Sequence, residues 1–193
     1  MKPLTLHKGF TLIELMIGLV ILSTLLALAF PAFTAMMQNS RVLNAAESFN
    51  TGLQLARAEA VRRNARVDFV VLSAATPATP TSKDVTAGDA AGQSWIVRAS
   101  TQTAGTFDFV DGKSAKEGSA SVVAVASAAP IVSFTSLGAS TLTAATLFQF
   151  TSGTGRGCQP TGDIRCMNVR VSVGGNSRLC DPAATAASDS RSC

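Results

Sequence analysis

The sequence predicts an α+β protein in which one long N-terminal helix is followed by an antiparallel β head that packs on it. Three observations lead to this prediction. An apolar run extends from Phe10 to Met37, an amphipathic pattern continues it from Ser40, and short β-rich runs without alternating helices fill the remainder. With 193 residues, the chain has room for one domain beyond the apolar run.

The apolar run is long enough to cross a membrane, because a bilayer core requires about 20 apolar residues in a helix. Its polar interruptions after the first turn are Ser23, Thr24 and Thr34. A secretory signal peptide is the alternative interpretation, but its cleavage site follows the apolar region. Here the small residue beside the charged leader is Gly9, which precedes the run. Cleavage there would remove residues 1–9 and leave the apolar helix as the new N-terminus.

The motif Gly-Phe-Thr-Leu-Ile-Glu-Leu at 9–15 resembles the signature of type IV pilins, of type II secretion pseudopilins and of the minor subunits of both. The resemblance implies that an inner-membrane prepilin peptidase cuts after Gly9 and that Phe10 becomes the N-methylated terminus. Lys2 and Lys8 favour a cytoplasmic N-terminus on independent grounds, since positive flanks tend to stay inside. We therefore expect a leader at 1–9, a transmembrane helix half at 10–37, an amphipathic helix half at 38–66 and a periplasmic head at 67–193.

Glu14 and Pro31 are the expected assembly residues of the span. An ionised carboxylate in a membrane costs about 2.5–3.5 kcal/mol on insertion scales, so such residues usually face a partner. The resemblance implies that the partner of Glu14 is the free amine of Phe10 in a neighbouring filament subunit. A carboxylate that merely reaches the membrane surface is the alternative. Pro31 removes one helical hydrogen bond and should bend the helix, and pilins commonly carry a proline at this place.

The amphipathic half carries one narrow apolar stripe, formed by Val42, Ala46, Phe49, Leu53, Ala56 and Ala60. Gly52 interrupts this half at a cost of about 1 kcal/mol, which close packing against a sheet would offset. The segments Leu53–Val67 and Ile131–Gly138 resemble the minor pseudopilins of the GspH and FimT type. The basic residues at the helix end are Arg62, Arg63 and Arg66. Their position needs no functional explanation, because positive charge at the C-terminus of a helix is stabilised by the helix dipole.

Eight short runs rich in β-branched and aromatic residues are predicted strands. They are Val67–Leu72, Trp95–Ala99, Thr106–Val110, Ser121–Val125, Ile131–Phe134, Leu147–Phe150, Met167–Val173 and Arg178–Cys180. The intervening Ser73–Gln93 segment, rich in small and polar residues, is predicted to be a mobile surface loop that buries no core. The terminal segment Pro182–Ser192 has a similar composition.

Four cysteines lie near the C-terminus, at Cys158, Cys166, Cys180 and Cys193. Beyond a membrane span they suggest disulfides in an oxidising compartment, and four cysteines allow three connectivities. We favour Cys158 with Cys166 and Cys180 with Cys193, because each pair closes a short loop. A zinc site is the alternative, but the spacing lacks a C-x-x-C pair.

No enzyme signature is complete, and no cofactor is expected. Gly112-Lys113-Ser114 resembles the end of a phosphate loop, but Phe107 stands where its first glycine is required. The single histidine, His7, lies in the expected leader, so no Ser-His-Asp set can form. Two function classes remain: a structural subunit that assembles with other pilins and helps prime a filament, and a module of that filament that binds DNA.

The DNA hypothesis depends on arginines near the C-terminal turns, because the net charge of +4 is too weak to imply nucleic acid. The candidates are Arg156, Arg165, Arg170 and Arg178. Some FimT-like subunits bind DNA through a Gly-Arg-x-Arg motif, and the matching segment here is Gly-Asn-Ser-Arg at 175–178. Only the second arginine is present, and Asp163 and Asp181 are expected to dilute the patch.

Overall fold

The fold was analysed in a computed structural model of the chain, which describes residues 9–73, 75–114, 117, 122–126, 130–186 and 188–193. The leader expected at 1–9 therefore lies outside the described residues except for Gly9. The chain divides into two compact units, one that ends at Met37 and one from Gln38 to Cys193.

Helix α1 (Leu12–Arg63) begins in the first unit, and its N-terminal part is long and apolar enough to cross a membrane. Two of its polar side chains satisfy their own hydrogen bonds within the helix. Ser23 Oγ donates to Val20 O and Thr24 Oγ1 donates to Ile21 O, both at 2.8 Å. Such bonds are what a hydrocarbon environment requires of a hydroxyl group. The helix continues through position 31, and a bend there stays a prediction.

The second half of α1 buries the apolar stripe that the sequence predicts. Val42, Ala46, Leu53, Ala56 and Ala60 are 0% exposed and Phe49 is 3% exposed. Gly52 lies on the same face, where an added Cβ would come within 2.8 Å of the Phe69 ring and 2.9 Å of the Trp95 ring. The glycine is therefore needed for the close approach of helix and sheet.

Helix α1 ends at Arg63, three residues before the boundary expected at 66. Asn64 takes the left-handed conformation, with φ of 49°. Its N–H donates to Val61 O, and Ala65 N donates to Ala60 O. This is the hydrogen-bond pattern of a Schellman motif, in which asparagine is an accepted alternative to glycine.

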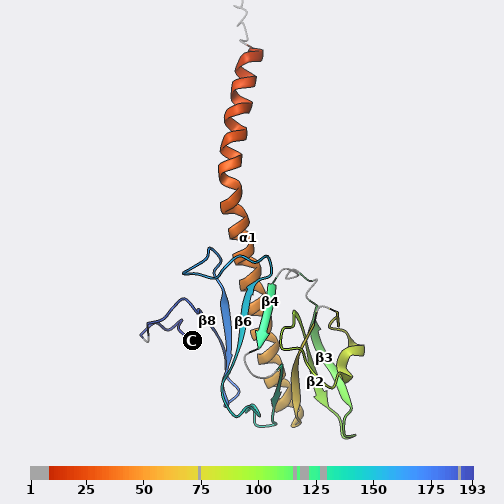
Figure 1. Cartoon of the computed structure of the whole chain (residues 1–193). Helices are drawn as coiled ribbons and strands as arrows, with labels where there is room; N and C mark the ends of the chain where they lie inside the picture. The colour runs from red at the N-terminus through yellow and green to blue at the C-terminus, as the bar shows by residue number, and fades with distance from the viewer. Residues whose placement is uncertain (1–8, 74, 115–116, 118–121, 127–129, 187) are drawn as a thin grey trace, which may run out of the picture. The chain divides into compact units, whose positions relative to one another are not determined.

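The head contains two four-stranded antiparallel sheets (Figure 1). The sequence predicts the antiparallel arrangement but not the division into two sheets. The strand order is β3-β2-β1-β5 in one sheet and β4-β6-β7-β8 in the other. All eight expected strands are present, with ends that differ by up to three residues. Their bounds are β1 Val67–Leu72, β2 Ser94–Ser100, β3 Phe107–Lys113, β4 Val122–Ala126, β5 Ile131–Phe134, β6 Thr146–Ser152, β7 Met167–Val171 and β8 Ser177–Cys180.

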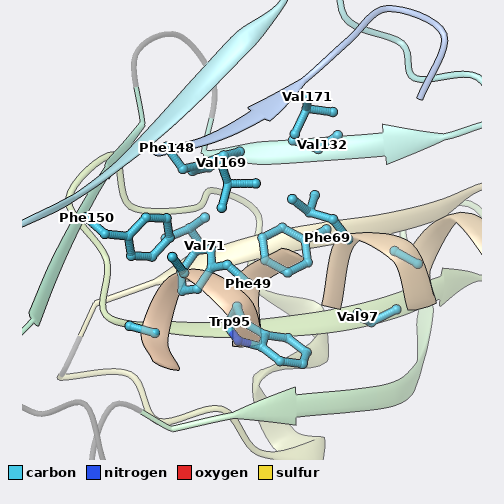
Figure 2. Packing of buried hydrophobic residues seen from close by; sticks show 14 of the residues in the cluster. Phe49, Phe69, Val71, Trp95, Val97, Val132, Phe148, Phe150, Val169 and Val171 are labelled. Carbon is cyan, nitrogen blue, oxygen red and sulfur yellow. The ribbon is translucent and has the colours of Figure 1, made fainter. Parts of the chain in front are cut away.

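The core lies where both sheets meet the second half of α1 (Figure 2). Phe49 of the helix is in its centre. The ring of Phe49 is 5.5 Å from that of Phe69 on β1 and 4.8 Å from that of Phe150 on β6, measured between centroids. Trp95 on β2 stacks on Phe69 at 5.6 Å and donates its indole N–H to Ser48 Oγ. One helix face thus joins the two sheets.

The expectation that Ser73–Gln93 buries no core is wrong for the residues described there. This segment contains the 3-10 helix η1 (Pro80–Asp84), and its Ala78 and Val85 pack on a second cluster of Val70, Leu72 and Ile96. Arg98 secures it, because this buried side chain donates to the carbonyls of Lys83 and Val85. The few apolar residues suffice because β1 is buried along its whole length and offers a second apolar face.

Candidate assembly terminus and basic surface

The N-terminus of α1 is closed by a hydrogen-bonded pair of side chains. Thr11, immediately before the helix, accepts from Glu14 N through its Oγ1 at 3.3 Å. Glu14 Oε2 in turn accepts from Thr11 N and from Thr11 Oγ1, each at 3.4 Å. This reciprocal arrangement is a capping box, which satisfies N–H groups that the first helical turn leaves unpaired.

Within the described residues the carboxylate of Glu14 thus has a partner inside its own chain. Both contacts are to Oε2, and no hydrogen bond to Oε1 is present in the described part of the chain. Gly9 has no neighbour within 4 Å of a hypothetical Cβ, and Phe10 is 81% exposed. Among the described residues, none beyond its chain neighbours therefore covers Gly9.

The cysteines form two disulfides, Cys158–Cys166 and Cys180–Cys193. Both bonds join the cysteines that the short-loop argument pairs. Sulfurs bonded in this way are not available as zinc thiolates. The second disulfide closes the terminal segment against β8, where Asp181 N also donates to Arg191 O at 2.7 Å.

Two of the four candidate DNA-binding arginines are neutralised by carboxylates. Arg156 is paired with Asp163, and Arg165 lies 3.1 Å from Asp181. Arg165 N also donates to Asn39 Oδ1 near the start of the helix half that belongs to the head. The dilution by these two aspartates that the sequence suggests is present, and it removes Arg156 and Arg165 as free cations.

Arg170 on β7 and Arg178 on β8 are directly opposite each other in the antiparallel register, so they share one face. Their guanidinium groups donate to backbone carbonyls of the terminal segment. Arg170 Nη1 donates to Cys193 O at 2.7 Å, and Arg178 Nη2 donates to Ser192 O at 3.2 Å. Among the ion pairs of the described residues, none joins either arginine to an Asp or Glu side chain.

Asn176 stands where the Gly-Arg-x-Arg motif has its first arginine, and it has a structural role here. Its Oδ1 accepts from Arg57 Nη1 of α1 at 2.6 Å, while Arg57 Nε donates to Gly138 O at 3.0 Å. An arginine at 176 would place a second positive charge against Arg57. The departure from the motif is therefore matched by a contact across 119 positions of sequence.

The sequence arguments missed Thr11 and Arg57. Thr11 had a readable signal, because Thr-x-x-Glu before an apolar run is the spacing of a capping box. Arg57 had none, since its acceptors come from two distant turns that the sequence does not place beside the helix.

Two family models match the chain, one over the N-terminal helix and one over the head. The family described as Type II transport protein GspH matches residues 45–175, and the prokaryotic N-terminal methylation motif matches residues 5–30. No curated protein matches the chain at a significant level.

Solved structures of a minor pilin have a similar fold. The type IV minor pilin FimU of Pseudomonas aeruginosa is similar in two crystal forms, each 18% identical, with TM-scores of 0.54 and 0.51. The matches cover 80% and 76% of this chain and 98% of each FimU chain. The minor pseudopilin EpsH from the type 2 secretion system of Vibrio cholerae has a TM-score of 0.46 at 16% identity, covering 74% of this chain and 98% of its own.

The GspH match covers more than half of the chain and includes the second half of α1 and the strands from β1 to β7. The methylation motif covers Gly9, Phe10 and Glu14. The chain therefore belongs to the GspH family of pseudopilins, which are structural and non-enzymatic proteins, and carries the N-terminal methylation motif of pilins.

Proposed function

We propose that the chain enters a type IV pilus or type II secretion pseudopilus through helix α1 and helps to prime the filament. The methylation motif implies processing by a prepilin peptidase, and the pilin family implies assembly with other pilins. Before assembly the protein crosses the inner membrane once, with its N-terminus in the cytoplasm and its head in the periplasm.

The observation that carries this proposal is the hydrogen bonding of the Glu14 carboxylate. It is the only charged residue between Phe10 and Ser40. Its Oε2 serves the capping box, whereas Oε1 has no hydrogen bond in the described part of the chain. One carboxylate can therefore cap its own helix and also accept from the terminal amine of Phe10 in a neighbouring subunit. Such a charged pair removes the cost of an isolated carboxylate in hydrocarbon.

Two substitutions separate these roles of Glu14. Glu14→Gln keeps a side chain that fits a capping box but removes the charge, whereas Glu14→Ala removes both. We expect both variants to insert and to be cleaved, and both to be lost from filaments. Co-purification with the other pilus or pseudopilus subunits measures incorporation, and intact mass measures cleavage.

Gly9→Val is the matched control, since a branched side chain beside the scissile bond should leave the chain uncut at its full mass. Incorporation of Glu14→Gln at the normal level, with Glu14→Ala excluded, would show that the cap matters and the charge does not. Normal incorporation of both variants would refute the assembly role of Glu14. For priming, cells without the chain should make fewer filaments of normal length.

A second candidate function, DNA binding, is favoured by the adjacent Arg170 and Arg178. They share one face and have no Asp or Glu partner among the described ion pairs. Two cations opposite each other on neighbouring strands can both contact the phosphates of a duplex. Arg156 and Arg165 are left out of this proposal because each is paired with an aspartate.

Gel-shift or filter binding of the full chain in detergent micelles tests this function. Binding should weaken steeply with salt, as counterion release requires. Replacement of Arg170 and Arg178 together should abolish it, while Arg156→Ala should not. Absence of retention at low salt, or retention unaffected by the double substitution, would leave the structural role alone.

A further inference from the structure

A groove of about 740 Å³ lies at the C-terminal end of α1. The helix contributes Arg57, Val61 and Arg62 to its walls. The turn after β5 contributes Leu137, and the turn between β7 and β8 contributes Asn176. Neither the filament motif nor the basic pair on β7 and β8 includes this surface.

The floor of the groove is built from two closely packed glycine turns. Gly138 and Gly175 have φ angles of +76° and +80°, and a Cβ at Gly175 would clash with Gly138 O. Arg57 fixes both turns to the helix through its bonds to Gly138 O and Asn176 Oδ1. The site is therefore organised before any partner arrives, which lowers the entropic cost of binding.

Large apolar side chains are exposed around this groove. Leu137 is 89% exposed and Val61 is 54% exposed. Val173, in the same turn as Gly175, is 47% exposed, and Leu43 is the remaining large hydrophobic residue exposed in the described part of the head. Exposed apolar residues that gather at one place, with polar residues around them, mark interaction sites.

The charge of the groove is positive. Arg57 bonds to two neutral acceptors and takes part in none of the ion pairs of the described residues. Glu59 is shared between Arg62, at 2.6 Å, and Arg63, at 2.7 Å. The residues that line the groove include two arginines, Arg57 and Arg62, and no carboxylate, so the groove can attract an acidic partner.

We propose that this groove binds an acidic segment of another protein, in which an apolar side chain packs on Leu137 and Val61 and a carboxylate pairs with Arg57 or Arg62. The inference rests on the proposed function, because the head of a neighbouring filament subunit is the source of such a segment. Duplex DNA fits less well, since phosphates gain nothing from Leu137 or Val61.

A peptide of alternating glutamate and leucine is the probe, with its glutamate–alanine and lysine–leucine counterparts as comparisons. Fluorescence anisotropy of labelled peptides with the full chain in detergent micelles gives the affinity. Leu137→Ser should weaken glutamate–leucine binding about tenfold, as expected when one leucine-sized contact is lost. Arg62→Gln should weaken it several-fold and reduce its dependence on salt.

Two variants are controls. Leu43→Ser changes an exposed apolar residue outside the groove, and Arg178→Gln changes the basic pair, so both should leave peptide affinity unchanged. Three outcomes would each overturn the proposal. The lysine–leucine peptide could bind as tightly as the glutamate–leucine peptide, or Leu137→Ser could leave the affinity unchanged. Duplex DNA could also displace the peptide from the native chain but not from Leu137→Ser.

The groove and the filament role fail in different ways. The side chain of Leu137 is 89% exposed, so Leu137→Ser should fold normally and be processed to the mature mass. It should nevertheless enter filaments less often than the native chain. If it assembles normally while Glu14→Ala is excluded, the groove proposal fails alone. If Glu14→Ala also assembles normally, the proposed filament role fails as well.

Discussion

The two halves of helix α1 belong to different compact units and follow different physical rules. From Leu12 to Met37 the large apolar side chains are exposed, with Phe33 at 59% and Leu28 at 80%. From Val42 to Ala60 one stripe is almost completely buried beneath two sheets. One continuous helix thus contains a part whose apolar side chains need a membrane or neighbouring helices, and a part whose apolar side chains are covered by the sheets of the head.

The two halves differ in how strictly they specify the side chain at each position. In the first half, apolar residues on every side suit lipid or neighbouring helices, and the hydroxyls of Ser23 and Thr24 bond within the helix. Many apolar residues would serve equally at a given position. In the second half, Phe49 and Gly52 meet particular rings of the sheets, so shape as well as hydrophobicity is required.

The largest expected difference comes from truncating one apolar residue in each half. Phe49→Ala should reduce the free energy of unfolding of the head by about 3–5 kcal/mol, because it empties the centre of the core. Leu22→Ala should leave it unchanged. Thermal or denaturant unfolding of the full chain in detergent micelles, followed by Trp95 fluorescence, measures both. An equal effect of the two substitutions would contradict the distinction.

Covalent closure is expected to matter for the head alone. The Cys180–Cys193 bond joins residues 13 apart, and its removal by serine substitution of both cysteines should destabilise the head by about 3 kcal/mol. The helix content of the first half should not change. Peptide mapping without reductant checks the connectivity first, and a Cys166–Cys180 linkage would contradict it.

Substitution of one helical glycine in each half of α1 should give a smaller difference in the free energy of unfolding. Gly52→Val should destabilise the head by about 1–3 kcal/mol, since the new side chain meets the rings of Phe69 and Trp95. Gly18→Val is the control, because a Cβ at Gly18 has nothing within 4 Å. Both residues are helical glycines, so an equal loss from the two would point to helix propensity instead of packing.

The smallest effect is expected from the carboxylate near the end of the helix. Hydrogen bonds from Arg62 and Arg63 lower the pKa of Glu59 to about 2. Because the folded pKa is depressed, the stabilisation is complete above the unfolded value of 4.5 and is lost as the pH falls towards 2. Glu59→Gln should therefore cost less than about 1 kcal/mol at neutral pH, as a surface pair does.

The same unfolding measurements, repeated in acid, check the sign of this effect. The stability difference between the native chain and Glu59→Gln should shrink as the pH decreases from 4.5 towards 2. A difference that grows in acid would show that the ion pair of Glu59 is not its source.

The long helix, the eight strands and the position of the processing motif could be predicted from the sequence. These features depend on local order: apolar residues without interruption, alternate spacings of four and three, and runs of β-branched residues. Such patterns survive in any tertiary arrangement that separates apolar from polar surface. The buried stripe from Val42 to Ala60 was predictable for this reason.

The way in which distant polar groups combine depends on the tertiary structure and could not be predicted. The bond between Arg57 and Asn176, the pairing of two of the four arginines with aspartates, and the packing of the Ala78–Val85 region on β1 all join residues far apart in the chain. Composition suggested that the Ser73–Gln93 segment was too polar to bury a core. Its Ala78 and Val85 are partly buried because Val70 and Leu72 give β1 a second apolar face, and composition holds no information about which surface a segment will meet.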